Sequence, residues 1–431
     1  MKSSIQRLIN LFLLAALWLA GCTKAAPTAL PALPTASVTL QPTALPLTPT
    51  PTILQGTVSI WHSLSEAQVP ALEQAITDFQ ASHPGIQFDV LYIPVENLQT
   101  RYDQAVREGY GPDILFGPAE WAPALFDAGL ITDLSGLAGQ AFLNTFNQAA
   151  LESARYKETL VGLPYAIRGV ALYRNKSLIP QAAATFDQLV TLAKAATQGE
   201  KIGAFLDRSF YFSGGHLAGI GGEWMTSDGI PAFNNDKGIA WLELLKSFEQ
   251  AGPTDYLTDN DLEAFKEGRV GFIIDGTWNL DELSAAVGAD NLAIDPWPAY
   301  EGGNLSGFVQ SENVYLAAPA AGKDPASAWK FMEYLLSPEA QTNLIAVGSI
   351  PAVTGVNVAD PARNMLIVQV IAALAGGAAY PTNPQIEAYI GPVDVAMRSF
   401  FDGQLSAPDA LKAAADAITN SLTGASATPT P

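Results

Sequence analysis

Residues 265–278, FKEGRVGFIIDGTW, are the stretch that decides the fold of this chain. Residues 270–274 form a compact apolar run, which predicts a short buried strand. Asp275 and Gly276 end that strand, and Trp278 comes directly after it. Because α/β sheets place ligands at the ends of their strands, the stretch predicts a strand with a candidate binding residue at its tip. A tryptophan in the core is the alternative interpretation.

Strand and helix patterns alternate through the sequence before this stretch. Residues 58–61 have the composition of a strand, residues 69–79 place apolar side chains at helical spacing, and residues 86–92 alternate with strand period. Residues 113–116 predict another short strand, and a helix follows that ends at Gly129. The β-α-β-α order predicts an α/β protein with a parallel sheet.

Local signals predict several boundaries. Ser65 and Gln68 have the spacing of a capping box, and so do Thr185 and Gln188, which predicts a helix start at each pair. Ser337 is followed by proline, as at a helix N-terminus. Two separate strands are expected at residues 160–164 and 170–173, and residues 365–375 are expected to form a buried helix.

The composition restricts the class of function. The chain has 431 residues, with 42 acidic and 22 basic side chains and a formal net charge of −20. Such a surface disfavours nucleic acid and anionic lipid as partners. Residues 56–424 are long enough for about two domains, and with one cysteine no disulfide framework supports them. The sequence shows no metal-binding cluster, so we expect neither a metal nor a cofactor.

Cys22, the single cysteine, follows a short apolar segment. Two basic residues precede a nearly continuous apolar run over residues 8–20, and residues 19–22 are LAGC, which resembles a lipobox. We expect residues 1–22 to be a lipoprotein signal peptide and Cys22 to carry a lipid that anchors the protein outside the bacterial cell membrane. A buried cysteine behind an apolar helix is the alternative, although the run is shorter than the roughly 20 residues that span a bilayer.

Residues 23–55 are built mainly from Thr, Pro, Ala and Leu. Closely spaced prolines remove backbone donors and fix φ, so neither a helix nor a central strand can form there. We expect an extended tether between the lipid and the folded body. Residues 425–431 have a similar Thr/Pro composition and are expected to be a disordered tail.

Five stretches occur in an order and spacing that belong to one family. They are VSIW (residues 58–61), GPDILF with GLITDL (111–134), GLPY with ALYRNKSL (162–178), FKEGRVGF with DGTW (265–278), and AWKF with LLSPEAQ (328–341). Together they resemble the extracellular solute-binding proteins of carbohydrate ABC transporters, of the maltose-binding-protein type. The similarity covers residues 57–422, nearly the whole body.

This resemblance implies an α/β protein with a two-lobed periplasmic-binding-protein fold, type II-like, in which several hinge crossings join the lobes around a ligand cleft. We expect residues 56–166 and 307–356 to form the N-terminal lobe, and residues 167–306 and 357–424 the C-terminal lobe. It also implies a monomer that closes on a carbohydrate ligand and docks on the permease subunits of an ABC transporter.

Sugar sites combine flat apolar faces with planar polar groups, which aromatic residues and carboxylates, amides or Arg supply. The resemblance implies that Trp278 stacks on sugar and that Glu120 contacts it, although an acid is also favoured at a helix N-terminus. Trp121 either stacks on the ligand or packs behind its loop. Asp275 either accepts a bond from a ligand hydroxyl or caps the next helix.

Seven further residues complete the candidate ligand-binding set. They lie after the first strand, at the first expected hinge crossing and in later segments: Ser63, Glu66, Tyr165, Arg168, Tyr211, Trp224 and Tyr389. The maltodextrin binders carry an acid where this chain has Arg168 and a tryptophan where it has Ile390. These departures weigh against the same ligand, and Arg168 could meet a more acidic sugar or pair with Glu120.

Other classes of function are open to the sequence. A binder of the same fold could take a polyamine or a phosphodiester. A secreted glycosidase would need two carboxylates at a suitable separation, nominally Glu120 and Asp275. No nucleophile elbow or zinc-protease motif is present, so we expect no catalytic residue. A surface adhesion module is disfavoured by the hinge crossings that the resemblance implies.

Overall fold

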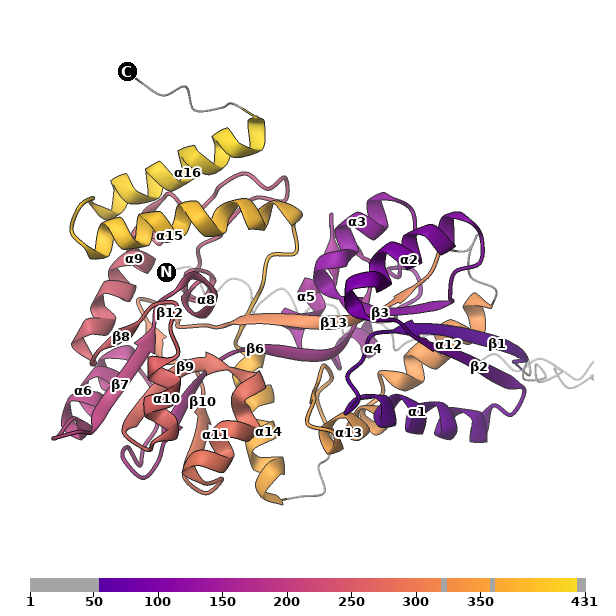
Figure 1. Cartoon of the computed structure of the whole chain (residues 1–431), viewed down its shortest axis with the longest axis horizontal. Helices are drawn as coiled ribbons and strands as arrows, with labels where there is room; N and C mark the ends of the chain where they lie inside the picture. Colours follow the sequence, from indigo (N-terminus) through magenta and orange to yellow (C-terminus); the bar gives the residue numbers. More distant parts are fainter. Residues whose placement is uncertain (1–53, 319–323, 357–360, 425–431) are drawn as a thin grey trace, which may run out of the picture. The chain divides into compact units, whose positions relative to one another are not determined.

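The computed structural model describes residues 54–318, 324–356 and 361–424 (Figure 1). Cys22, the expected signal peptide and nearly all of the expected tether lie outside the described residues. The expected tail at residues 425–431 lies outside them as well.

One mixed sheet organises the described body. Its strands follow the order β2-β1-β3-β13-β6-β9-β7-β8. The bounds are β1 Gly56–His62, β2 Ile86–Tyr92, β3 Ile114–Pro118, β6 Leu163–Asn175, β7 Ile202–Asp207, β8 Thr254–Asp255, β9 Val270–Gly276 and β13 Phe308–Leu316. Three short strands pair off this path: β10 Leu292–Asp295 and β14 Ile350–Pro351 with β6, and β15 Ala378–Ala379 with β13. Two hairpins are separate: β4 Arg155–Tyr156 with β5 Thr159–Leu160, and β11 Ala299–Tyr300 with β12 Gly303–Asn304.

Helices follow most strands, as the α/β pattern predicts. The longer ones are α1 Val69–Ser82, α2 Val95–Arg107, α6 Phe186–Ala196, α9 Asp236–Ser247, α11 Leu280–Val287, α12 Pro325–Leu335, α13 Pro338–Ala346, α14 Pro361–Ala375, α15 Glu387–Phe401 and α16 Ala407–Thr423. The shorter ones are α3 Ala122–Asp127, α4 Gln140–Leu143, α5 Gln148–Ser153, α7 Phe210–Ser213, α8 Gly215–Gly219 and α10 Asn260–Lys266. The 3-10 turns are η1 Ala119–Trp121, η2 Phe248–Gln250, η3 Thr277–Asn279 and η4 Pro384–Ile386.

Strands β13 and β6 lie in the middle of the sheet. They connect a first half, made of β2, β1 and β3, with a second half, made of β9, β7 and β8. Residues 163–169 of β6 pair antiparallel with β13, and residues 170–174 pair with β9. The prediction of a second strand at residues 170–173 is therefore wrong, because β6 is continuous and all its residues except Arg168 are buried. The antiparallel pairs of β6 and β13 also make the sheet mixed, whereas β1 pairs in parallel with β2 and β3 as expected.

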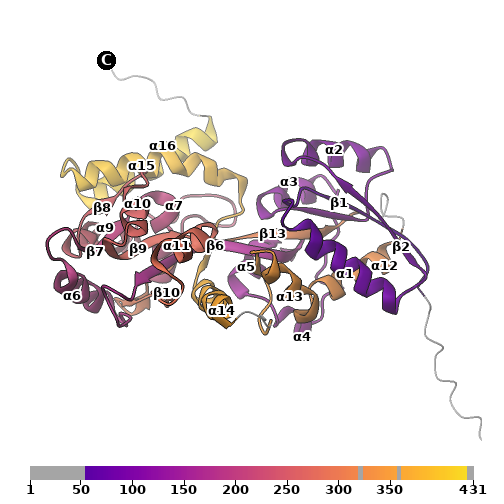
Figure 2. The same ribbon diagram turned by 60° about the horizontal axis from the view of Figure 1, so that its bottom comes forward.

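Apolar helix faces cover the sheet. In the first half α1 packs beside α12 and α13 (Figure 2), where the rings of Phe79 and Phe331 meet edge to face at 5.4 Å. In the second half α15 and α16 pack against each other, and α16 also contacts α9. The assignment of residue ranges to two lobes stays a prediction, because one sheet continues through both halves.

Helix starts follow the capping chemistry at two of the three predicted positions. Thr185 accepts a bond from the Gln188 backbone N–H, and Ser337 accepts one from the Ala340 N–H. At the third position the predicted start is wrong, because α1 begins at Val69 with a proline in its first turn.

Helix α14 is apolar on both its buried and its exposed face. Ile367, Val370 and Leu374 are buried, but Met365 and Val368 are 60% and 52% exposed, so the expectation of a buried helix holds for one face. Within the described ranges, no helix is both long and apolar enough to cross a membrane.

Candidate functional site

Two strand ends in this sheet carry the same local structure. Strand β3 ends in a glycine, Gly117, and a proline and runs into η1, and β9 ends in Gly276 and runs into η3. A tryptophan ring lies against each glycine: a Cβ on Gly117 would stand 2.4 Å from the Trp121 ring, and a Cβ on Gly276 would stand 2.1 Å from the Trp278 ring. Each glycine is therefore required for the close approach of its tryptophan.

Trp278 is the solvent-facing member of the pair. Its side chain belongs to the most exposed large apolar groups of the body, at 51%. The Trp278 ring lies 5.9 Å from the Tyr211 ring and 6.4 Å from the Phe212 ring. Tyr380 extends this aromatic cluster, with its ring 5.9 Å from that of Tyr211. An exposed ring supported by other rings is the flat apolar surface that a sugar face requires.

A small pocket lies beside Trp278 and is called the hinge pocket here. Its volume is about 150 Å³, and its lining is Gln68, Ala166, Ile167, Arg168, Thr277, Trp278, Glu312, Gly348, Ser349 and Ile350. This is smaller than the roughly 300–1,000 Å³ of a typical small-molecule site, so the pocket is one part of a binding surface.

Polar side chains from β6 and β13 line this surface. Arg168 stands opposite Gln310 in the strand register, and Gln310 and Glu312 are two residues apart on β13. Side chains at these positions project from the same face of the sheet. Arg168 is exposed and makes no ion pair with any described residue, so the expected alternative of a bond to Glu120 is not formed.

Glu120 instead belongs to a hydrogen-bond chain that joins the two halves of the sheet. The Gln310 side-chain amide donates to Glu120 Oε1 at 2.7 Å, and the Tyr211 hydroxyl donates to Gln310 Oε1, also at 2.7 Å. Glu120 follows β3 in the first half, whereas Tyr211 lies on α7 in the second. We call these three residues the Gln310 relay.

Burial raises the pKa of two groups on this surface. It raises the pKa of Tyr211 to about 12, a value that Arg168 moderates by its positive charge. Burial also raises the pKa of Glu312, and Arg168 and a hydrogen bond from Gln68 oppose that shift. The surface therefore combines a neutral phenol, an amide, carboxylates and a guanidinium around one exposed indole.

Three of the expected ligand-binding residues are core residues in this structure. Tyr165 is 1% exposed and packs edge to face on Phe116, with ring centroids 5.0 Å apart. Trp224 is 4% exposed and donates its indole N–H to the Gly214 carbonyl. Tyr389 is fully buried and donates its hydroxyl to the Gly229 carbonyl at 2.7 Å. Their rings have no exposed face in this structure, and their contact with a ligand stays a prediction.

Asp275 is buried and held by local hydrogen bonds. It is 5% exposed and accepts bonds from the Gly276 backbone N–H at 2.6 Å and from the Asn279 amide at 3.2 and 3.3 Å. The expected capping role is not seen, because neither η3 nor α11 receives a capping bond from a side chain, and the role of Asp275 as an acceptor for a ligand hydroxyl stays a prediction.

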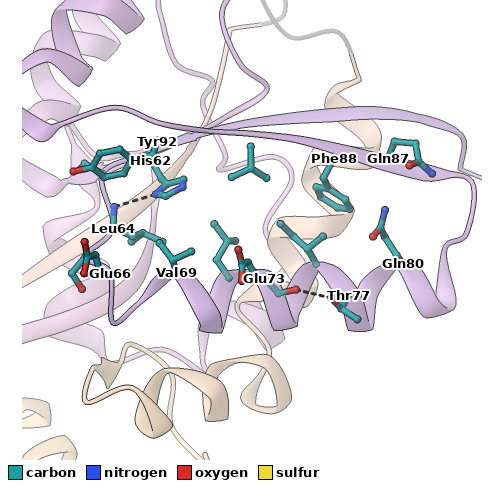
Figure 3. Close-up of a pocket in the computed structure, with 15 residues that line it drawn as sticks. His62, Leu64, Glu66, Val69, Glu73, Thr77, Gln80, Gln87, Phe88 and Tyr92 are labelled. Carbon is teal, nitrogen blue, oxygen red and sulfur yellow. Dashed lines mark hydrogen bonds between the residues drawn. The ribbon is translucent and has the colours of Figure 1, made fainter.

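Ser63 and Glu66 lie in a different depression. They line a groove of about 840 Å³ between α1 and the strands β1 and β2 (Figure 3), which shares no lining residue with the hinge pocket. The larger cavity is thus away from Trp278, and its chemistry is considered separately below.

Sequence reasoning missed the central residues of the relay and the hinge pocket. Gln310 and Glu312 belong to β13, whose four consecutive polar residues, QSEN at 310–313, interrupt an otherwise apolar strand. Such a polar run inside a buried strand costs free energy unless its groups find partners, and it was the signal available in the sequence.

Comparisons with known proteins identify the family of this chain. A sequence profile described as "Bacterial extracellular solute-binding protein" matches residues 74–365, more than half of the chain. The maltooligosaccharide ABC transporter solute-binding lipoprotein of Streptococcus pneumoniae (strain ATCC BAA-255 / R6) is 28% identical over 331 residues, 73% of this chain and 76% of that protein. The maltotriose-binding protein of Pyrococcus abyssi is 24% identical over 323 residues, 70% of this chain and 67% of that protein.

Solved structures show the same fold. The extracellular solute-binding protein from Staphylococcus aureus in complex with maltose aligns with a TM-score of 0.75 and 21% identity, over 85% of this chain and 98% of that one. This similarity confirms the fold class that the sequence predicted.

Proposed function

Because the chain belongs to the family of bacterial extracellular solute-binding proteins, we propose that it captures a sugar or oligosaccharide outside the cell and delivers it to an ABC importer. The observation that carries this proposal is Trp278, an exposed indole held against Gly276 beside the charged and amide groups of the hinge pocket.

Each group has a defined role in this proposal. Trp278 supplies the apolar face for the C–H side of a sugar ring. Arg168 donates to ring hydroxyls, whereas Glu120 and Glu312 accept from them. Gln310 orients Glu120 and Tyr211, which come from different halves of the sheet, so ligand contacts to these residues favour one arrangement of the two halves.

The relatives indicate which sugars to test first. Maltotriose and maltooligosaccharides stand in the names of the Pyrococcus and Streptococcus proteins, and a galactooligosaccharide-binding protein of Bacillus subtilis is 24% identical over 385 residues. We propose an α-glucan or galactan oligosaccharide as the ligand class, with Arg168 selecting among its members.

The proposal extends to location and partners. Cys22 would carry the lipid, and residues 23–55 would tether the body near the membrane, where it meets the permease subunits. The name of the streptococcal relative, a lipoprotein of an ABC transporter, supports this arrangement.

The proposal also predicts no turnover. Both oxygens of Asp275 are near the Asn279 amide, and Glu120 is bonded to Gln310. This arrangement suits binding better than the acid–base pair of a glycosidase, in which one carboxylic acid must donate a proton to the leaving group.

A thermal-shift and calorimetry screen tests the proposed function. The full chain with Cys22→Ser would be titrated with maltose, maltotriose, a galactooligosaccharide, spermidine and glycerophosphocholine. Saturable 1:1 binding of one of the sugars, with a raised melting temperature and no hydrolysis products, is the expected result. Binding of spermidine or glycerophosphocholine alone would replace the sugar proposal with the alternative ligand class, and release of smaller sugars would replace binder with enzyme.

A further inference from the structure

The groove between α1 and β2 is a wide depression on the body, and the sugar proposal does not use it. We call it the α1–β2 groove. Its lining combines the apolar residues Leu64, Val69, Leu72, Ile76, Phe88 and Val90 with the polar residues Glu66, Glu73, Thr77, Gln80 and Gln87. Several of them, such as Leu64, Phe88, Glu73 and Gln80, are labelled in Figure 3. The volume of about 840 Å³ leaves space for several side chains.

The groove adjoins a free sheet edge. Strand β2 is the first in the strand order, so one of its edges has no strand partner within the described body. Five of its seven residues are exposed, among them Val90 at 40%, Leu91 at 44% and Tyr92 at 57%. An exposed, apolar strand with a free edge is a template for pairing with another extended segment.

The strand alternation links this edge to the groove. Phe88, Val90 and Tyr92 alternate along β2, and all three line the groove, whereas Asp89 and Leu91 do not. A strand added beside β2 would place every second side chain on the same face, above the α1 flank that carries Glu73 and Gln80. At the start of β2 the Gln80 amide already donates to the Ile86 carbonyl at 2.9 Å, so the free edge begins at Gln87.

The negative charge of the groove determines the charge that an occupant must carry. Glu66 and Glu73 are exposed on its rim and make no ion pair with any described residue, and no Lys or Arg lines the groove. The net charge of the chain, −20, adds to the local negative potential. An occupant must therefore supply positive charge as well as apolar side chains.

We propose that the α1–β2 groove binds an extended segment of a partner protein, apolar at alternate positions and carrying Lys or Arg. The segment pairs as an added strand with the free edge of β2. Its apolar side chains pack on Phe88, Val90 and Ile76, and its basic groups form ion pairs with Glu66 and Glu73. This site adjoins the proposed sugar site without sharing a lining residue, since Ser65 in the groove donates from its hydroxyl to Gln68 of the hinge pocket at 3.2 Å.

Synthetic peptides test the proposal on the full chain with Cys22→Ser. The probe is an acetylated octapeptide of alternating Val and Lys with a terminal fluorophore, and the control replaces each Lys with Glu. We expect saturable binding of the Lys peptide, slowed amide hydrogen exchange confined to residues 87–92 and the facing flank of α1, and at least tenfold weaker binding of the Glu peptide.

A charge swap distinguishes binding in the groove from general electrostatic attraction to the acidic chain. Glu66→Lys with Glu73→Lys should weaken the Lys peptide about fivefold and strengthen the Glu peptide about fivefold, since two exposed ion pairs contribute this much. The matched control, Glu200→Lys with Asp290→Lys, changes the net charge equally at exposed positions elsewhere and should change neither affinity by more than twofold.

N-methylated peptides test the pairing mode. Methylation of alternate backbone nitrogens removes the donors on one peptide edge, so one of the two alternate patterns should abolish binding and the other should leave it within threefold. Equal loss with both patterns, no exchange protection at residues 87–92, or equal effects of the two charge-swap pairs would overturn the proposal. Concentration-dependent dimerisation that Val90→Asp abolishes, without peptide binding, would assign the groove to a second copy of the chain instead.

Discussion

The ends of β3 and β9 have the same local structure, but the tryptophan that follows each strand has a different environment. In both, a glycine near the strand end lets a tryptophan ring lie on the backbone, and a 3-10 turn leads into a helix. Trp121 is half-buried and packs against the cluster of Leu115, Leu125 and Tyr315. Trp278 is 51% exposed and meets Tyr211 and Phe212 at its side.

The difference lies in what surrounds each ring and not in the local chain. Around Trp121 the neighbouring helix α3 and the strands supply apolar contacts, so its indole contributes to stability. Around Trp278 the neighbours are half-buried rings and the polar lining of the hinge pocket, so much of its indole stays free for a ligand. We therefore expect one strand end to be a structural anchor and the other a binding surface.

The largest predicted effect is the opposite response of the two tryptophans to alanine. Trp278→Ala should lower the affinity for the sugar by about 30- to 100-fold, roughly 2–3 kcal/mol, because the stacking face is lost, while the free energy of unfolding changes by less than about 1 kcal/mol. Trp121→Ala should lower the free energy of unfolding by about 2–3 kcal/mol through lost packing and change affinity less. Calorimetry and urea unfolding measure the two quantities.

The conservative variants Trp278→Phe and Trp121→Phe serve as controls and should each recover part of the lost property. If both alanine variants lost affinity and stability in equal measure, the distinction between an anchor and a binding surface would be wrong.

This division between the two tryptophans shows what the sequence could and could not predict. The strand at 270–276 and the position of Trp278 at its tip follow from a compact apolar run and a glycine, both local signals. The burial of Tyr165, Trp224 and Tyr389 does not follow from local signals, because each is covered by elements distant in sequence. An aromatic residue in a loop or helix has the same local pattern whether it faces a core or a ligand.

Gln310 shows that the partners of a polar residue are equally hard to predict from local sequence. Its partners Glu120 and Tyr211 are 190 and 99 residues away in sequence. The antiparallel register of β13 with β3 brings Glu120 close, and the packing of α7 against β13 brings Tyr211 close. The polar run at residues 310–313 showed that partners must exist. It did not identify them, because the register of distant strands is set by the whole sheet.

The second predicted effect tests the glycines that hold the two rings. Gly276→Ala would place a methyl 2.1 Å from the Trp278 ring, so the ring must move, and we expect about tenfold weaker sugar binding. Gly117→Ala would place one 2.4 Å from the Trp121 ring and should lower the free energy of unfolding by about 1–2 kcal/mol.

Gly391→Ala is a matched control, since no atom lies within 4 Å of the added methyl. The double variant Gly276→Ala with Trp278→Ala should bind no more weakly than Trp278→Ala alone. A further loss in the double variant would show that Gly276 acts on something other than the indole.

The third predicted effect uses three buried acids, which lie on β9 and on the neighbouring elements β7 and α10. Burial and neighbouring carboxylates raise the pKa of Asp261 to about 8, and burial raises those of Asp207 and Asp275 to about 6. The folded state therefore binds protons that the unfolded state has released, so stability is lost as the pH rises through 8. We expect the free energy of unfolding to increase by about 1–2 kcal/mol between pH 9 and pH 6.5.

Urea unfolding across this range measures the slope. Below pH 6.5 the fully buried His216 opposes the trend, because burial lowers its pKa to about 4, which is why the range stops there. Asp261→Asn should remove most of the slope, and the exposed Asp290→Asn should leave it unchanged. A slope that persists in Asp261→Asn would place its origin elsewhere in the chain.

The smallest predicted effect concerns the Gln310 relay, which connects the surroundings of the two tryptophans. Gln310→Met keeps the side-chain length and removes both hydrogen bonds, so Glu120 and Tyr211 lose their fixed orientation. We expect about fivefold weaker sugar binding, roughly 1 kcal/mol. If the relay acts as a unit, Glu120→Ala and Tyr211→Phe should each weaken sugar binding in the protein that retains Gln310. The loss of binding free energy in the double variant should then be smaller than the sum of the two single losses. Each substitution should also have a smaller effect in the Gln310→Met background. Fully additive losses would show that the two halves of the sheet contact the ligand independently, and the two strand ends would then be linked by the ligand alone.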